Sequence, residues 1–341
     1  HYVKTMMKPI APILLFATLS VMNGCTAMPS SKAPDTLNSA PQTQYDALLV
    51  NPANKTALTP EELAQQLADV DVVVVGEYHG HHGSHLLQSR LQSALFRLRP
   101  EQILSMEQFN LDRQDELNRY LRGETGETEM IEDAEAWDNY RASYRPLVEF
   151  ARRHDLPVIA SNAPADVVRC VGRKGPGYLD RISDTLRQKL PAKPFMDTPE
   201  YREKFMAAIG ASHQADDTMS ERMDNTYKAQ LLRDNTMATR ILQARTEHPE
   251  HQVLHVTGTF HSENGLGTVA LLKQRAPEIS VAVVRPAFWA SDVNEAPLEN
   301  NRAKGDFIYF IQPLPDEFRD AQREREAMTA RFRRSTDKSC D

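Results

Sequence analysis

The sequence predicts an α/β protein with an open, mostly parallel sheet flanked by helices and a small inserted helical subdomain. The first observation is that short apolar runs typical of strands alternate along the chain with longer segments whose apolar residues have helical spacing. The second is DVVVVGE at residues 71–77, which is apolar on both faces, as a strand buried in a parallel sheet should be. The third is the stretch between Asn162 and Tyr227, where strand patterns disappear and helical patterns continue.

Strands and helices are expected to alternate along most of the chain. The expected strands are residues 71–77, 102–108, 157–162, 252–258, 280–286 and 306–312. The helix expected at residues 84–98 carries leucines at helical spacing, and Pro157 ends the helix at residues 145–154 before the third strand. The remaining helices are expected at residues 226–248 and 266–276 and in the charged tail at 317–334. Helices in this order connect parallel strands by crossovers.

The predicted insertion lies inside the sheet domain. Helical segments at residues 178–190 and 200–210 are separated by clusters of proline and glycine. The predicted division is therefore an α/β domain formed by residues 45–162 and 227–341, interrupted by a helical subdomain at 163–226.

Residues 1–25 have the pattern of a secretory signal. Lys4 and Lys8 precede an apolar run, residues 10–22, which ends in Asn-Gly-Cys and is too short for a stable membrane span. Glycine before cysteine resembles a lipoprotein box and predicts Cys25 as the lipid-bearing first mature residue. The alternative is an ordinary signal peptide with an incidental cysteine. Residues 26–44 are rich in Ser, Pro, Thr and Gln, which predicts a flexible tether.

A lipid anchor predicts a location in the cell envelope. Thr26 is not an acidic retention residue, which favours the outer membrane of a Gram-negative cell. The formal charge of -7 and the lack of a basic stripe exclude nucleic acid as an expected partner. Cys170 and Cys340 lie in neither a CxxC motif nor a Cys/His pair, which excludes a zinc ribbon and leaves one disulfide possible.

Polar residues follow the ends of four predicted strands. They are Glu77 with His79, Glu107, Ser161 with Asn162, and His261. In an open α/β sheet, ligands bind outside the carboxyl ends of the strands, so these side chains are expected at one edge. Two Glu and two His could hold a divalent metal and lower the pKa of its bound water, or act without metal as an acid/base set. The alternative is that Glu77 and Glu107 accept hydrogen bonds and only organise the edge.

Two further groups of residues are ambiguous. His81 and His85 have a metal-chelating spacing on a helix, but no carboxylate lies between them as in HExxH, so an exposed helix face is the favoured interpretation. Tyr140 and Tyr144 are also four apart, and arginines flank them. A phenolate can bind ferric or haem iron, and neighbouring cations would favour the ionised phenol. The alternative for the tyrosine pair is packing in the core.

The chain resembles the ChaN family of iron-regulated haem-binding lipoproteins in five motifs that occur in order. They are GEYHGHHGSHLLQ, MEQF, WDNYRASYRPLVEFARRHDLPVIASNAP, AQLLRDNTMA and VTGTFHSENGLGT. The resemblance implies two stacked haems at a dimer interface, each iron held by a tyrosine that a histidine of the neighbouring subunit assists. By motif position it implies Tyr144 as the iron ligand, with Tyr140 as the alternative, and His213 as the assisting histidine. A fainter similarity to erythromycin-esterase and TIKI-type hydrolases matches their catalytic constellation to Glu77, His79, Glu107 and His261.

Two functional hypotheses follow. The favoured one is a homodimeric outer-membrane lipoprotein that binds haem for iron acquisition, with an outer-membrane haem receptor as a candidate partner. The other is a metal-assisted hydrolase that uses the Glu and His residues at the sheet edge. The sequence therefore favours a binding protein and leaves enzymatic activity open.

Overall fold

The computed structural model describes residues 37, 39–210 and 217–341. The predicted signal peptide, Cys25, most of the predicted tether and His213 lie outside the described residues. The predictions for these segments therefore stay predictions.

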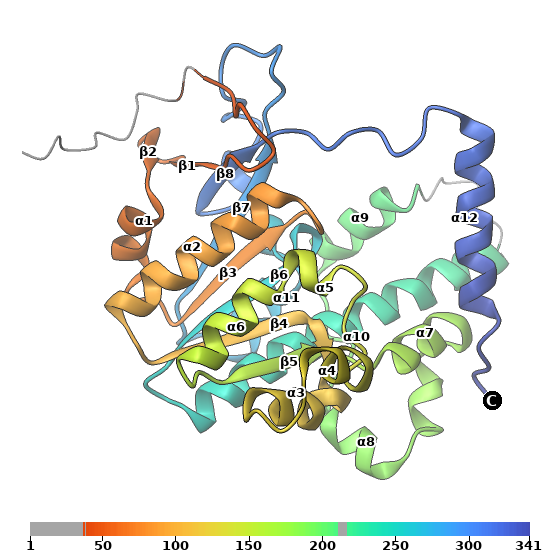
Figure 1. Cartoon of the computed structure of the whole chain (residues 1–341). Helices are drawn as coiled ribbons and strands as arrows, with labels where there is room; N and C mark the ends of the chain where they lie inside the picture. The colour runs from red at the N-terminus through yellow and green to blue at the C-terminus, as the bar shows by residue number, and fades with distance from the viewer. Residues whose placement is uncertain (1–36, 38, 211–216) are drawn as a thin grey trace, which may run out of the picture. The chain divides into compact units, whose positions relative to one another are not determined.

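One mixed sheet forms the centre of the fold (Figure 1). Within the described residues its strands are β1 (Leu48–Asn51), β2 (Thr56–Leu58), β3 (Val72–Glu77), β4 (Gln102–Asn110), β5 (Val158–Asn162), β6 (Gln252–Gly258), β7 (Val281–Phe288) and β8 (Phe307–Ile311). Their order is β2-β1-β8-β7-β3-β6-β4-β5. Strands β3 to β8 pair in parallel, while β1 is antiparallel to both β2 and β8. The six predicted strands are confirmed, and the sequence pattern missed only the short antiparallel pair at one edge.

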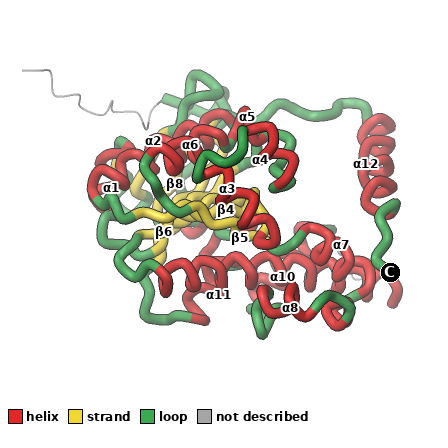
Figure 2. The backbone as a smooth tube through the Cα atoms, turned by 60° about the horizontal axis from the view of Figure 1, so that its bottom comes forward, coloured by secondary structure: helices red, strands yellow, loops and turns green. Residues whose placement is uncertain are grey.

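Helices cover both faces of the sheet, as Figure 2 shows. The helices are α1 (Pro60–Leu67), α2 (His82–Leu98), α3 (Gln114–Leu121), α4 (Glu127–Asp133), α5 (Tyr140–Ser143), α6 (Arg145–Arg153), α7 (Ala165–Lys174), α8 (Asp184–Lys189), α9 (Pro199–Ala208), α10 (Asp217–Glu247), α11 (Thr268–Arg275) and α12 (Ala321–Thr336). Residues of α1 to α6 share one core with Val73 and Val75, and residues of α10 and α11 share a second core with Val72 and Val74. Because successive strand residues point to opposite faces, the run of valines can fill both cores. No helix in the described ranges is long and apolar enough to cross a bilayer.

The inserted helices pack on the long helix α10. Side chains of α7 and of the segment around α8 form one apolar cluster with Leu232, and α9 forms another with Tyr227 and Leu231. Helix α10 starts at Asp217 and continues without interruption to Glu247, so it runs through residue 227, where the sequence placed a domain boundary. The same helix therefore supports both the insertion and the sheet.

The C-terminal segment is fixed at both of its ends. It leaves the sheet after β8, and the disulfide Cys170–Cys340 joins its far end to α7. Arg169 adds a hydrogen bond to the backbone oxygen of Lys338 (2.9 Å). Between these attachments, α12 contains no buried residue. The disulfide that the sequence left open is therefore formed in this structure.

Candidate functional site

Three neighbouring parallel strands bring the polar residues of the site together. Strands β3, β6 and β4 are adjacent in the sheet, and Glu77 at the end of β3 lies opposite Gly258 at the end of β6. The pairing of β4 with β5 shifts register between Met106 and Asn110, around Glu107. Such a bulge redirects side chains near the end of a strand. The edge at which the sequence placed Glu77, His79, Glu107 and His261 therefore exists, and all four side chains lie at it.

Glu77 is a buried carboxylate that four side chains hold in place. Its Oε2 accepts hydrogen bonds from the hydroxyl of Tyr144 (2.6 Å) and from Nδ1–H of His79 (3.0 Å). Its Oε1 accepts from the amides of Gln88 (3.2 Å) and Gln108 (3.1 Å). Only 1% of Glu77 is exposed, so these donors replace the water that the carboxylate loses on folding.

His79 is the accessible member of this group. Its side chain is 43% exposed, in contrast to the buried Glu77 to which it donates. Burial lowers the pKa of His79, but the hydrogen bond to Glu77 and the charges of Glu77 and Glu107 outweigh that effect and raise it. The Nε2 atom has no hydrogen-bond partner among the residues that the structure describes. His79 is thus an oriented base with one free nitrogen.

The structure does not present the predicted tyrosine ligands to solvent. Tyr144 is 0% exposed, and burial together with the charge of Glu77 holds the pKa of its phenol well above the ordinary value. The flanking cations do not oppose this effect, since Arg145 pairs with Glu127 instead. Tyr140 is buried as well, and burial raises the pKa of its hydroxyl, which has no hydrogen-bond partner in the described part of the chain. The expectation that neighbouring cations favour an ionised phenol is therefore wrong for this structure, and core packing accounts for both rings.

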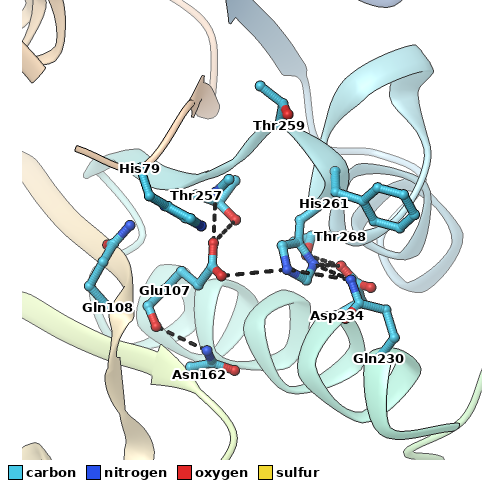
Figure 3. A network of polar contacts seen from close by, with 12 residues as sticks. His79, Glu107, Gln108, Asn162, Gln230, Asp234, Thr257, Thr259, His261 and Thr268 are labelled. Carbon is cyan, nitrogen blue, oxygen red and sulfur yellow. Dashed lines mark hydrogen bonds and ion pairs between the residues drawn. The ribbon is translucent and has the colours of Figure 1, made fainter. Parts of the chain in front are cut away.

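A second buried network contains His261, which lies in a short turn of helix directly after β6 (Figure 3). Its Nδ1–H donates to Asp234 Oδ1 (2.7 Å), and its Nε2 faces Glu107 Oε1 at 3.5 Å. Asp234 also accepts hydrogen bonds from Tyr201 (2.5 Å) and Thr268 (2.9 Å). The imidazole therefore lies between two carboxylates that come from different elements, α10 and β4.

This placement keeps the imidazole charged. Burial would lower the pKa of His261, but the carboxylates of Asp234 and Glu107 raise it to about 10. Burial likewise acts to raise the pKa of Glu107, but the positive charge of His261 holds it well below the ordinary value. At neutral pH the site thus contains an imidazolium between two carboxylates.

Gly258 connects the two networks. Its backbone N–H donates to Glu107 Oε2 (2.7 Å), which also accepts from the hydroxyl of Thr257 (2.6 Å). A Cβ atom on Gly258 would lie 3.0 Å from Cε1 and Nε2 of His79, so any larger residue would push against the imidazole. Glycine at this position lets His79 lie directly over the end of β6, beside Glu107.

The prediction of an exposed histidine face on α2 is wrong for two of its residues. His81 is 0% exposed and caps the helix, because its Nδ1 accepts from Gly83 N–H (3.0 Å) while Nε2–H donates to the backbone oxygen of Gln312 (2.8 Å). His85 is 8% exposed and bridges Gly80 N–H (3.0 Å) and the Gln88 side chain (3.0 Å). Both rings support the turn that carries His79, so they are structural and not peripheral.

Sequence reasoning did not single out Asp234 or Tyr201. Asp234 follows the apolar pair Leu231 and Leu232 in α10, and is itself 0% exposed. An acidic residue within an apolar stripe indicates a buried ion pair, so the pattern could have identified it. Nothing local marks Tyr201, whose role depends on how α9 packs against α10.

The chemistry available at this edge is proton transfer and charge stabilisation. His79 offers a free nitrogen oriented by a carboxylate, and His261 offers a buried positive charge. No group of three or more His, Cys, Asp or Glu side chains in the described ranges is arranged to hold a metal ion.

A family model described as haem-binding uptake, Tiki superfamily, ChaN matches residues 63–272, which include both networks. The chain belongs to the ChaN family. A search of curated proteins gave no match. The match ends before β7, β8 and α12, so Cys340 lies outside the matched range while its disulfide partner Cys170 lies within it.

A search of solved structures found similar chains for this ChaN-family protein. ChaN of Campylobacter jejuni, described as showing cofacial heme binding, is 16% identical with a TM-score of 0.59, covering 79% of this chain and 98% of that one. An erythromycin esterase variant in its open conformation is 13% identical with a TM-score of 0.43, covering 79% and 82% of the two chains. A succinoglycan biosynthesis protein is 12% identical with a TM-score of 0.42, covering 73% and 89%. At these identities the similarity to the Campylobacter protein confirms the predicted α/β fold and no more.

Proposed function

We propose that this chain binds haem and acts in haem or iron acquisition as an outer-membrane lipoprotein anchored through Cys25. The observation that carries the proposal is membership of the ChaN family across residues 63–272, including the whole polar edge. The fold shared with the haem-binding Campylobacter protein supports it. The partner proposed for this role is an outer-membrane haem receptor.

In its finer form, the proposal places haem at the interface of two copies of the chain, with a tyrosine on the iron. Motif position implies Tyr144. However, its buried hydroxyl donates a hydrogen bond to Glu77, and its raised pKa keeps it protonated. Tyr144 therefore does not fit the iron in the conformation described, and its ligation requires that Glu77 release it and that the phenol reach the surface.

His79 fits the iron without such a rearrangement. Its Nδ1–H donates to a buried carboxylate and leaves Nε2 free, which is how proteins commonly orient an imidazole that binds metal. Its exposed face can meet a flat ligand at the surface of the edge. His79 and Tyr144 are thus two distinguishable iron donors within one network.

Haemin titration of the purified protein tests the proposal. Wild type is expected to shift the Soret band at stoichiometric haemin, and native mass spectrometry is expected to show two chains with two haems. Tyr144→Phe removes a tyrosinate charge-transfer band if the tyrosine binds iron, whereas His79→Gln changes the spectrum if the imidazole does. A wild-type protein without any saturable haemin binding contradicts the function itself.

One specific observation favours a second function. His79 donates to the buried carboxylate of Glu77, and His261 donates to that of Asp234. The geometry suits acid–base hydrolysis without metal, in which His79 takes a proton from water and His261 holds the carboxylates of Asp234 and Glu107 in place. Glu77 and Asp234 act as positioning residues, because each holds one ring by its Nδ1–H.

An ester-substrate screen with a pH profile tests this second function. Any hydrolysis is expected to depend on His79 and to rise with pH as His79 loses its proton. A matched control is His82→Gln, because His82 belongs to the same histidine-rich segment but is exposed. Equal rates for wild type and His79→Gln contradict the assignment.

A further inference from the structure

The three buried carboxylates of the site, Glu77, Glu107 and Asp234, are all hydrogen-bonded. Each buried carboxylate has a full set of donors, with four side chains on Glu77 and three groups each on Glu107 and Asp234. The imidazole of His261 lies between two of these carboxylates. A cation that still lacks a partner is therefore the group to which a ligand would bind.

Arg233 is that cation. It precedes Asp234 on α10 and is half-buried, yet its guanidinium has no hydrogen bond or ion pair with any residue that the structure describes. Arg240 and Arg245, which are also half-buried on α10, are both satisfied. Arg240 donates to Gln114 (2.8 Å), and Arg245 pairs with Asp71 (3.0 Å). Arg233 thus departs from the pattern of its own helix.

Arg233 is adjacent in α10 to Asp234, whose carboxylate belongs to the site. Burial lowers the pKa of its guanidinium, and the negative charges of Glu107 and Asp234 act in the opposite direction. An arginine side chain stays protonated under these conditions, so a positive charge lies beside the edge. Glu107 and Asp234 cannot neutralise it fully, because their oxygens already accept hydrogen bonds from other groups.

We propose that Arg233 binds a carboxylate group of the ligand at this edge. A guanidinium presents two parallel N–H donors that match the two oxygens of a carboxylate, and a half-buried position strengthens the pair. This inference rests on the proposed function, in which haem supplies the carboxylate as a propionate. In the hydrolytic alternative, the same arginine selects substrates that carry an acidic group.

Comparison of haemin with its dimethyl ester tests the pairing, since the ester keeps the porphyrin and iron but lacks both carboxylates. Wild type is expected to bind haemin roughly 10- to 100-fold more tightly than the ester, the range of one charge-assisted pair. Arg233→Gln is expected to lose most of that preference by weakening haemin alone, and Arg233→Lys to keep part of it. Arg240→Gln, a change in a satisfied arginine of the same helix, should leave the preference intact.

Equal preference for haemin in wild type and Arg233→Gln overturns the inference while leaving haem binding in place. Wild type that binds neither porphyrin refutes the haem function, and a carboxylate probe then decides the role of Arg233. Succinate should raise the melting temperature of wild type but not of Arg233→Gln, and equal shifts overturn the inference. If Arg233→Gln does not fold, Arg233→Lys replaces it in both comparisons.

Discussion

Replacement of Asp234 by asparagine gives the most direct test of the buried charge network. The side chain of Asp234 is 0% exposed and accepts three hydrogen bonds, from His261 (2.7 Å), Thr268 (2.9 Å) and Tyr201 (2.5 Å). Asp234→Asn keeps the shape but removes the negative charge nearest the imidazolium. Because it leaves a buried cation with only the more distant Glu107, we expect a loss of about 3–5 kcal/mol in the free energy of unfolding near pH 7.

The pKa of His261 also predicts how the free energy of unfolding should change with pH, and over which pH range. The pKa of His261 is raised to about 10 by Asp234 and Glu107, against about 6.5 in the unfolded chain. A raised pKa in the folded state contributes stability that is complete below about pH 6.5 and is lost as pH rises through 10. The shift of about 3.5 units corresponds to at most about 5 kcal/mol. In Asp234→Asn, His261 keeps only Glu107 as a carboxylate partner, so most of the stability lost between pH 6.5 and pH 10 in wild type should not be lost in the variant.

Urea unfolding of both proteins at intervals from pH 6 to pH 10 measures the effect. The difference between wild type and Asp234→Asn removes groups that titrate in both, such as lysines and tyrosines. Histidine NMR signals at Cε1–H should assign the raised pKa to His261. A wild-type His261 that titrates near 6.5, or stability curves that stay parallel up to pH 10, would refute the reasoning.

Three further changes have defined outcomes. Glu77→Gln should lower the pKa of His79 toward its ordinary value, because it removes the hydrogen-bonded carboxylate that raises it, and NMR titration of His79 checks this. Gly258→Ala should keep the fold but displace the His79 ring, because the new Cβ would lie 3.0 Å from it while the ring is partly exposed and can move. Loss of the nuclear Overhauser contacts between His79 and residue 258 would show the displacement, and unchanged contacts would contradict it. Cys340→Ser should free α12, which contains no buried residue, so trypsin should cleave within α12 first. The melting temperature of the remaining core should change by only a few degrees. Cleavage of the core at the same rate as α12 would contradict this prediction.

Much of the fold could be predicted because its strands carry their own pattern. The run of valines in β3 is apolar on both faces, and the leucines of α2 recur at helical spacing, so local sequence is enough to define each element. The antiparallel pair β1 and β2 was not predicted, because these strands are only four and three residues long. The predicted start of helix α10 was nine residues too late, because its polar first turns lack an apolar period.

The candidate site could be predicted in part. Glu77, His79, Glu107 and His261 each follow the end of a strand, and parallel strands bring such positions to one edge whatever the loops do. The surroundings of the tyrosines could not be predicted. Tyr144 has arginines beside it in the sequence, but in space its hydroxyl meets Glu77, 67 positions away.

The sequence by itself determined which segments become strands and helices, and at which edge of the sheet the polar residues gather. These features depend on residue periodicity and on the direction of parallel strands, which are local properties of the chain. Only the tertiary structure decided which charges are paired, because Asp234, Glu107 and His261 come from separate elements and interact strongly only once buried together. For the same reason, a protonated Tyr144, a charged His261 and an Arg233 without a partner among the described residues could be recognised only in the folded molecule.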